Sequence, residues 1–297
     1  MKIRTKRRSL MNNNTKKKKG PWQEVWRRLK KNKMAMFGLT IIILLSICAI
    51  FADYIAPYGY DEQDLSRRFL FPCKEHLLGT DNFGRDILSR IIYGSRISLT
   101  VGFIAVGLAI IVGGTLGAIA AFYGGKIDNI IMRAMDILLA IPGMLLAIAL
   151  AAALGPGLKN MMIAIGVGSV PGYARVVRAS VLTVREEEFV EAAISIGASD
   201  ARIIFHHIIP NAMAPIIVQA TLGVASSILS AAALSFLGLG IQPPIPEWGA
   251  MLSGARQYIR DYWHLTTFPG LMIMITIYAL NVLGDGLRDA LDPRLKN

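Results

Sequence analysis

Charged residues are scarce in this sequence: Asp, Glu, Lys and Arg make up 18% of its 297 residues. A soluble domain usually carries about a quarter of charged residues. Hydrophobic residues make up 54% of the chain, and the mean hydropathy is +0.48. Because several long runs carry no charge, the composition excludes an ordinary soluble domain and indicates a protein that crosses a membrane several times.

Cysteine is also scarce, with Cys48 inside the first apolar run and Cys73 in the polar segment that follows it. This pair offers no disulfide framework, so we interpret both cysteines as structural. The first apolar run itself continues past the length of a signal-peptide core, and no small-residue cleavage site followed by a soluble domain appears. We therefore expect it to remain in the protein as a membrane helix.

Motifs that support catalysis are absent as well. The segment Gly124-Gly125-Lys126 lacks the leading glycine and the Ser or Thr of a phosphate-binding loop. No metal-ligand spacing occurs, and the adjacent side chains of His206 and His207 diverge on a helix. Paired carboxylates and a nucleophile elbow are also missing. We expect a chain that is not an enzyme and that binds no cofactor or metal itself.

Positive charge is concentrated at the N-terminus. The net charge is +12, and residues 1–33 hold fourteen Lys or Arg and one acid, Glu24. This segment therefore carries +13, and the remainder of the chain carries −1. A basic segment before the first apolar run predicts a cytoplasmic N-terminus, and it favours contact with anionic lipid. No aromatic-interleaved basic groove follows, so nucleic acid is not an expected partner.

Six apolar runs are candidates for membrane-spanning helices, because a helix satisfies its own backbone hydrogen bonds in lipid. Four of them carry no charge, the first has Asp53 near its outer end, and the fourth reaches Arg175. The predicted spans are Phe37–Ala56, Ile97–Phe122, Ile137–Leu154, Met161–Val177, Met213–Leu237 and Phe268–Leu283. The fourth is the weakest, since Pro171-Gly172 interrupt it. An even number of spans places both termini on one side. The later loops carry nine Lys or Arg on each side, so the N-terminal segment alone decides the orientation.

Glycines recur in the second predicted span, at Gly102, Gly107, Gly113, Gly114 and Gly117. Small residues let helix backbones approach closely, so we expect this span to pack against protein. Before it, the residues from Asp81 to Arg90 have an amphipathic pattern. That pattern predicts a short helix lying on the outer membrane surface, and either a structural role or contact with a partner is open.

A polar interruption between the fourth and fifth spans is predicted to face the cytoplasm. Thr183 and Glu186 have the spacing of a capping box that starts a helix. Phe189, Ala193 and Ile196 then recur on one apolar stripe. Gly197 is suited to a left-handed helix end. Ser199 is a possible cap of a second short helix through about Ile208, which Pro210 closes. Near the third span, Arg133 and Asp136 are expected to pair locally.

This interruption resembles the coupling loop of permease subunits in ATP-binding-cassette importers, whose pattern is Glu-Ala-Ala, three residues, Gly, nine residues and Ile-x-Leu-Pro. The chain supplies Glu191-Ala192-Ala193 and Gly197, then His207 and Ile209-Pro210. His207 stands where the pattern has Ile, and Ile209 where it has Leu, so the tail matches loosely. The candidate coupling residues are Phe189, Glu191, Ala192, Ala193, Ile196, Gly197, Ile209 and Pro210.

Four further segments narrow the resemblance to the second-subunit (C) type of the dipeptide/oligopeptide/nickel permease group. They are Asn32 to Gly38 (NKMAMFG), Leu78 to Asp86 (LGTDNFGRD), Tyr93 to Leu99 (YGSRISL) and Leu283 to Arg294 (LGDGLRDALDPR). The resemblance implies an all-α polytopic membrane protein of six helices, in which one extra N-terminal helix precedes a five-helix type I importer core. It covers nearly everything after about residue 22.

The resemblance also implies partners and a domain plan. The partners are a homologous sister permease, two cytoplasmic ATP-binding subunits that bind ATP and magnesium, an extracytoplasmic substrate-binding protein and membrane lipid. The setting is a bacterial cell membrane with both termini cytoplasmic. The expected segments are a basic tail (1–33), a first helix (34–57), an extracytoplasmic loop (58–96), a permease core (97–287) with a coupling loop (183–211), and a tail (288–297).

The implied function is a permease subunit that forms half of a translocation pathway for di- or oligopeptides and couples to a cytoplasmic ATPase. Nickel or a metal chelate carried by the same machinery is an alternative. A secondary transporter or channel is a rival of another class, although the spans contain few ionisable residues and no clear inverted duplication. A membrane-embedded enzyme is a third class, but the sequence has no paired carboxylates, nucleophile elbow or metal-ligand set to support it.

Overall fold

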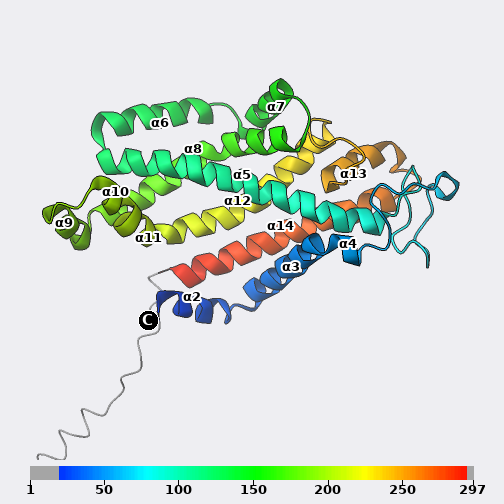
Figure 1. Ribbon diagram of the computed structural model, residues 1–297, viewed down its shortest axis with the longest axis horizontal. Helices are drawn as coiled ribbons and strands as arrows, with labels where there is room; N and C mark the ends of the chain where they lie inside the picture. The colour runs from blue at the N-terminus through cyan, green and yellow to red at the C-terminus, as the bar shows by residue number, and fades with distance from the viewer. Residues whose placement is uncertain (1–19, 293–297) are drawn as a thin grey trace, which may run out of the picture.

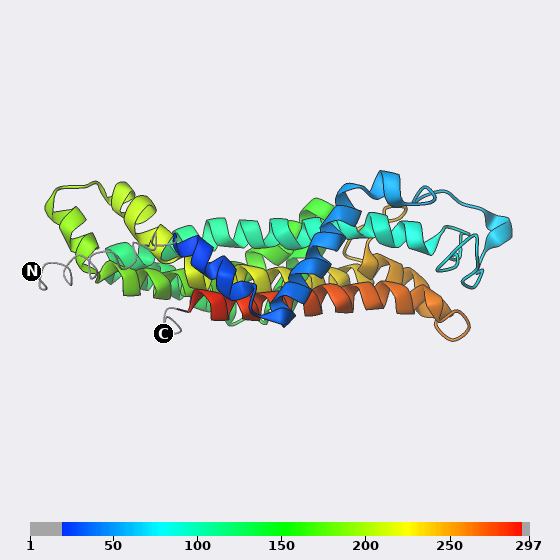
Figure 2. The ribbon, with the colours of Figure 1, turned by 90° about the horizontal axis from the view of Figure 1, so that it is seen from below.

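A computed structural model describes residues 20–292, and this part of the chain is built from helices. Expectations for residues 1–19 and 293–297 lie outside the described residues. The long helices α5 (Ile87–Tyr123), α8 (Leu158–Arg185), α12 (Met213–Phe236) and α14 (His264–Leu291) run along the long axis of the bundle, and α3 (Lys33–Ile50) crosses them obliquely (Figures 1 and 2). The described residues form no strand, apart from an isolated bridge between Thr80 and Asp86. The predicted all-α fold is confirmed.

Shorter elements complete the bundle. They are α2 (Pro21–Leu29), α4 (Ala52–Ile55), η1 (Leu65–Arg67), α6 (Gly125–Leu139), α7 (Gly143–Leu154), α9 (Glu188–Ser195), α10 (Asp200–Arg202), η2 (Ile203–Ile208), α11 (Ile209–Asn211), α13 (Trp248–Ala255) and η3 (Arg256–Tyr258). At one end of the bundle lie α2, α9 to α11 and the last turn of α14 (Figures 1 and 2). We call it the α9 end. The opposite, α13 end carries α4, residues 56–86 and α13.

Membrane crossing is supported by the length and composition of the helices. Four described helices qualify as membrane spans, namely α3, α5, α12 and α14, and a fifth is added if α6 and α7 count as one span. The 28-residue α8 does not meet the same criterion, although it packs along α5 in the bundle. Its helix also continues without a break through Pro171 and Gly172, so the predicted interruption of the fourth span is wrong.

Two other sequence-based boundaries need correction. The helix expected to lie on the membrane surface before the second span is not separate, because α5 runs uninterrupted from Ile87. Its 37 residues extend about 55 Å, well beyond the roughly 30 Å of hydrocarbon in a bilayer. The predicted third span, Ile137–Leu154, is broken instead: α6 and α7 meet at an angle of 84°. Pro142, which lacks a backbone N–H, stands at this break.

Helices α5 and α8 run parallel and pack closely along their length. A Cβ atom added at Gly113 would collide with the carbonyl oxygen of Val170, and one added at Gly117 with that of Ala174. Glycine is therefore required for this backbone approach, as expected for helices that associate inside lipid. The prediction that the glycine-rich span packs against protein is confirmed here, while Gly107 faces open space.

Buried polar residues organise the α13 end. The Asp86 carboxylate caps α5 by accepting a hydrogen bond from the Ser89 N–H at 2.7 Å, and it lies 2.9 Å from Nδ1 of His76. Nε of Arg85 donates to Asp81 at 2.7 Å. These bonds tie residues 76–86 to the start of α5, although Nε2 of His76 is buried without a hydrogen-bond partner among the described residues.

Glu247 is the most deeply buried acid at this end, with 1% of its surface exposed. Its carboxylate caps α13 by accepting hydrogen bonds from the N–H groups of Gly249 at 2.9 Å and Ala250 at 2.8 Å. The hydroxyl of Ser98 lies 3.4 Å away. Burial raises the pKa of the Glu247 carboxyl above its ordinary value of 4.5, although these hydrogen bonds oppose the shift.

The α5–α8 contact leads to a prediction with a matched control. Gly117→Ala should lower the free energy of unfolding by about 1–3 kcal/mol, because the added methyl group overpacks the interface. Gly107→Ala, on the same helix but facing open space, should leave stability unchanged or raise it by up to about 1 kcal/mol. The thermal unfolding midpoints of the two variants in detergent test this. Equal midpoints would contradict the packing.

Burial of Glu247 predicts a pH effect. A raised pKa in the folded state means that this group's stabilising contribution is complete below pH 4.5 and is lost as the pH rises through the raised folded pKa. Glu247→Gln should therefore flatten the fall in thermal stability above pH 4.5 relative to the unmodified chain. Melting curves of both proteins across the pH range provide the measurement. Identical pH profiles would show that Glu247 does not titrate with folding.

Candidate docking site formed by α9 to α11

The polar interruption is a compact helical element at the α9 end. The predicted capping box is wrong, because α8 continues through Thr183, whose hydroxyl donates to the carbonyl of Ala179 at 3.2 Å. The buried Val181 keeps α8 packed to its last turn. Helix α9 instead begins at Glu188, and its N-cap, Glu187, makes no side-chain capping bond.

Gly197 ends α9 as predicted. Its φ is +74°, which places it in the left-handed region that a side chain disfavours. The N–H of Gly197 donates to Ile194 O at 2.9 Å, and the N–H of Ala198 donates to Ala193 O at 3.1 Å. These two bonds form a Schellman motif, which satisfies the last carbonyls of the helix and reverses the chain.

The return segment is one irregular helix. It starts after Ser199, whose carbonyl accepts a hydrogen bond from Ile203 but whose side chain makes no capping bond. The segment passes through a wide π-helical turn, η2, and ends at Asn211. Pro210 lies within its last turn, α11, rather than after it. The expected end near Ile208 is therefore three residues too early.

One face of α9 to α11 is buried against the bundle. Val190, Ile203 and Ile208 are at most 2% exposed. The cluster that contains them also holds Ala118, Ala121, Val177, Val181, Ala193, Ile204, Ala212 and Ile216, which come from α5, α8, the segment itself and α12. The element is therefore fixed to three long helices by hydrophobic packing.

Hydrogen bonds add to this attachment. The hydroxyl of Tyr123, at the end of α5, lies 3.1 Å from the Asp200 carboxylate. Nη1 of Arg185, at the end of α8, donates to Ala121 O at 2.9 Å. The first bond ties the end of α5 to the start of the return segment, and the second ties the end of α8 to α5.

A second face of the element is apolar and exposed. The exposed fraction is 42% for Phe189, 84% for Ile196 and 64% for Phe205, and Ala192 is exposed between the first two. Phe189, Ala192 and Ile196 follow a spacing of three and four residues, which places them on one side of α9. We call these three residues with Phe205 the apolar docking face.

This face corrects the predicted stripe. Ala193 does not belong to it, because Ala193 is 5% exposed and packs inward. Among the other candidates, Glu191, Gly197 and Pro210 are exposed, and Ile209 is half-buried against the cluster. Phe205 was missed because the sequence argument followed only the first helix. The available signal was the apolar residue Phe205 within the second predicted helix, next to Ile204.

Ion pairs join α8 to α6 beside this site. Arg178 makes two hydrogen bonds to Asp128, at 2.6 and 2.5 Å. Arg175 pairs with Asp136 at 2.6 Å, so the expected local pairing of Asp136 with Arg133 is wrong. Asp136 is instead bound by an arginine of the neighbouring helix α8. Within residues 20–292 no three potential metal ligands gather.

Two family models match separate parts of the chain. The model described as the binding-protein-dependent transport system inner membrane component matches residues 113–297. The model of the N-terminal TM domain of oligopeptide transport permease C matches residues 20–72. The first match covers more than half of the sequence. This chain belongs to the family of binding-protein-dependent transport system inner membrane components, and within it to the C-type peptide permease group.

Curated relatives agree with this assignment. The dipeptide transport system permease protein DppC of Alkalihalophilus pseudofirmus is 54% identical over 93% of this chain and 91% of its own. The di/tripeptide transport system permease protein DppC of Pseudomonas aeruginosa is 48% identical over 93% of each. The glutathione transport system permease protein GsiD of Escherichia coli O6:K15:H31 is also 48% identical, over 93% and 91%.

Solved structures support the fold. An inward-facing MetNI methionine ABC transporter superposes with a TM-score of 0.57, at 18% identity, over 68% of this chain and 96% of that one. An amino acid ABC transporter gives a TM-score of 0.53 at 16% identity, over 68% and 94%. The predicted resemblance to importer permeases is thus confirmed for the fold and for the family.

The two faces of α9 to α11 predict different mutational costs. Ile208→Ala should lower the free energy of unfolding by about 2–5 kcal/mol, because it opens a cavity in the buried cluster. Ile196→Ala, at an 84% exposed position, should change it by no more than about 0.5 kcal/mol. Thermal unfolding together with hydrogen exchange in α9 to α11 measures both. Similar losses in the two variants would contradict the burial pattern.

Proposed function

We propose that this chain is one of two transmembrane permease subunits of an ATP-driven importer for short peptides, and that α9 to α11 dock onto a cytoplasmic ATPase. The observation that carries the docking role is the apolar docking face, which is exposed on an element otherwise fixed to α5, α8 and α12. Exposed apolar side chains grouped on an anchored element are typical of a protein interface.

In this proposal the chain forms part of the translocation pathway, and the partner subunits supply the energy of ATP hydrolysis. ATP and magnesium belong to two cytoplasmic ATP-binding subunits, and this chain binds neither and catalyses no reaction. Phe189, Ala192 and Ile196 insert into a groove of the ATPase, Glu191 pairs at its edge, and Gly197 sets the angle of the return segment. When the ATPase moves α9, the buried cluster carries that displacement into the long helices, because packed elements shift as units.

Orientation follows from the charge of the N-terminal segment. Residues 1–33 carry +13, and α2, the described part of this segment that precedes α3, lies at the α9 end (Figure 2). The positive-inside rule then places the α9 end and both termini in the cytoplasm. The α13 end faces outward in the bacterial cell membrane, toward the extracytoplasmic substrate-binding protein. A homologous sister permease completes the pathway.

The cargo proposal rests on the relatives. Their names give dipeptides, di/tripeptides and glutathione as the transported molecules, and glutathione is itself a tripeptide. A short peptide is the chemistry that these relatives share, so we place the same class of cargo here. Uptake of labelled di- and tripeptides by the reconstituted complex tests this part separately from docking.

Docking is tested with three variants of the reconstituted complex. The double variant Phe189→Ser/Ile196→Ser should weaken ATPase binding and peptide uptake at least tenfold, because buried interface anchors each contribute about 2 kcal/mol or more.

Gly197→Val should leave membrane insertion intact but uncouple ATP hydrolysis from uptake. Ile194→Ser serves as control, since Ile194 is 54% exposed on the opposite side of α9. Normal uptake in the double variant, or an equal loss in the control, would refute the docking role.

A further inference from the structure

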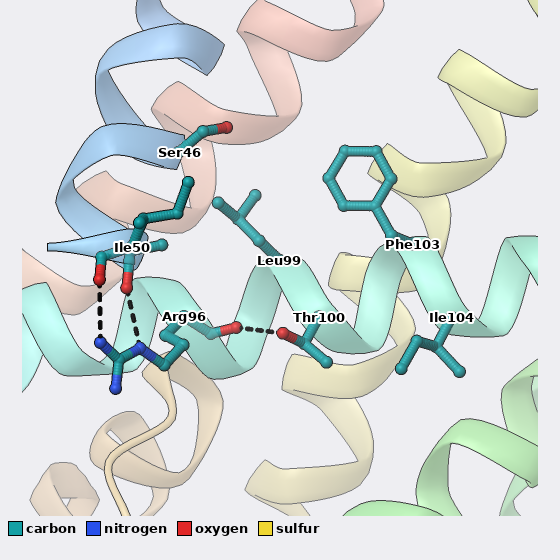
Figure 3. A pocket seen from close by; sticks show the side chains of 8 residues that line it. Ser46, Ile50, Arg96, Leu99, Thr100, Phe103 and Ile104 are labelled. Carbon is teal, nitrogen blue, oxygen red and sulfur yellow. Dashed lines mark hydrogen bonds between the residues drawn. The ribbon is translucent and has the colours of Figure 1, made fainter. Parts of the chain in front are cut away.

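A groove lies between α3 and α5 on the outside of the bundle, close to the α13 end (Figure 3). Its volume is about 420 Å³. Leu99, Phe103 and Ile104 of α5 form most of its apolar wall, and Phe103 is 52% exposed. Arg96 stands at one end of the groove. The groove is therefore mostly apolar, with the positively charged side chain of Arg96 at one end.

Arg96 has one role that the structure explains. Its Nε donates to Ala49 O at 2.8 Å, and its Nη2 donates to Ile50 O at 3.2 Å (Figure 3). These bonds satisfy carbonyls of the last turn of α3, where the helix dipole favours positive charge. Nη2 also reaches the Asp53 carboxylate at 2.9 Å. Within residues 20–292, no hydrogen bond uses Nη1, so two N–H donors remain available beside the groove.

Asp53 gives the mouth of the groove a second, opposite charge. Its side chain is 60% exposed, and the hydrogen bond from Arg96 lowers the pKa of its carboxyl, so that it is ionised at neutral pH. The hydroxyl of Tyr93 also faces this carboxylate. A carboxylate has about four acceptor positions, so it retains acceptor positions for an external donor.

The length of the groove along α5 is close to the hydrocarbon thickness of one bilayer leaflet. The membrane span of α3 ends at Ile50, whose carbonyl Arg96 caps, so Arg96 lies where hydrocarbon meets headgroups. From Arg96 to Ile104 the helix advances about 12 Å. Half of a bilayer's hydrocarbon core is about 15 Å. The groove thus extends from headgroup level through most of one leaflet.

We propose that this groove binds one phospholipid whose headgroup carries a primary ammonium, with its phosphate on Arg96, its ammonium on Asp53 and an acyl chain along Leu99 and Phe103. The charges decide the class of lipid. An anionic headgroup without an ammonium leaves Asp53 facing a negative charge, and a choline headgroup has no N–H to donate to the carboxylate. The bound lipid braces α3 against α5.

The test uses the purified, delipidated full chain and native mass spectrometry. Dioleoyl phosphatidylethanolamine, phosphatidylglycerol and phosphatidylcholine are titrated separately. We expect one phosphatidylethanolamine to bind about tenfold more tightly than either other lipid, the scale of a hydrogen-bonded charge. Asp53→Asn, which keeps Arg96 on α3, should remove this preference. Phe103→Ser should weaken binding of all three lipids several-fold.

A variant outside the groove is the matched control. Ile111→Ser changes an exposed residue of α5, 70% exposed and outside the groove, and should leave lipid binding unchanged. Arg96→Gln should abolish binding, and Asp53→Asn keeps the test valid if that variant fails to fold. Equal retention of the three lipids by all variants would overturn the proposal. So would a crosslink at position 103 to another polypeptide, or to a second copy of the chain, in place of lipid.

Discussion

The backbone contact between α5 and α8 is the constraint on which the rest of this structure depends. At Gly113 and Gly117 the carbonyls of α8 occupy the space that a side chain would fill. In lipid, apolar surface gives little drive for helices to associate, so this close approach and its van der Waals contacts hold the pair together. The contact brings both helices to the same end of the bundle, where Arg185 donates to Ala121.

A different force holds the element attached at that end. Helices α9 to α11 project beyond the span-forming part of the bundle, where water makes the burial of Val190, Ile203 and Ile208 favourable. Their inner face thereby continues the α5–α8 interface, and their outer face remains exposed. The proposed docking role requires this attachment, because a docking face on a loose loop transmits no displacement to the membrane helices.

At the opposite end, polar side chains bind the backbone groups at helix ends, because the first N–H and last carbonyl groups of any helix lack intrahelical partners. Asp86 caps α5, Glu247 caps α13 and Arg96 caps the end of α3. The same helix, α5, therefore begins in a polar network and ends beside the docking element. The groove between α3 and α5 lies beside Arg96, whose Nη1 keeps two N–H donors that no hydrogen bond among the described residues uses.

Hydropathy, glycine positions and charge predicted much of the helical architecture of this protein from its sequence. The long apolar runs identified the membrane helices, and Gly197 was correctly expected to end α9, because its turn depends only on local backbone geometry. Local pattern could not show that Ala193 faces inward, that Asp136 pairs with Arg175, or that α8 runs on past Thr183. Those outcomes depend on residues distant in sequence, such as Val181 and Ile216, which cover one face and leave another free. The sequence by itself determined the apolar helical segments and the turn at Gly197. The tertiary structure decided where α8 ends, where α6 and α7 break and which faces are buried, because these depend on neighbouring helices rather than on order along the chain.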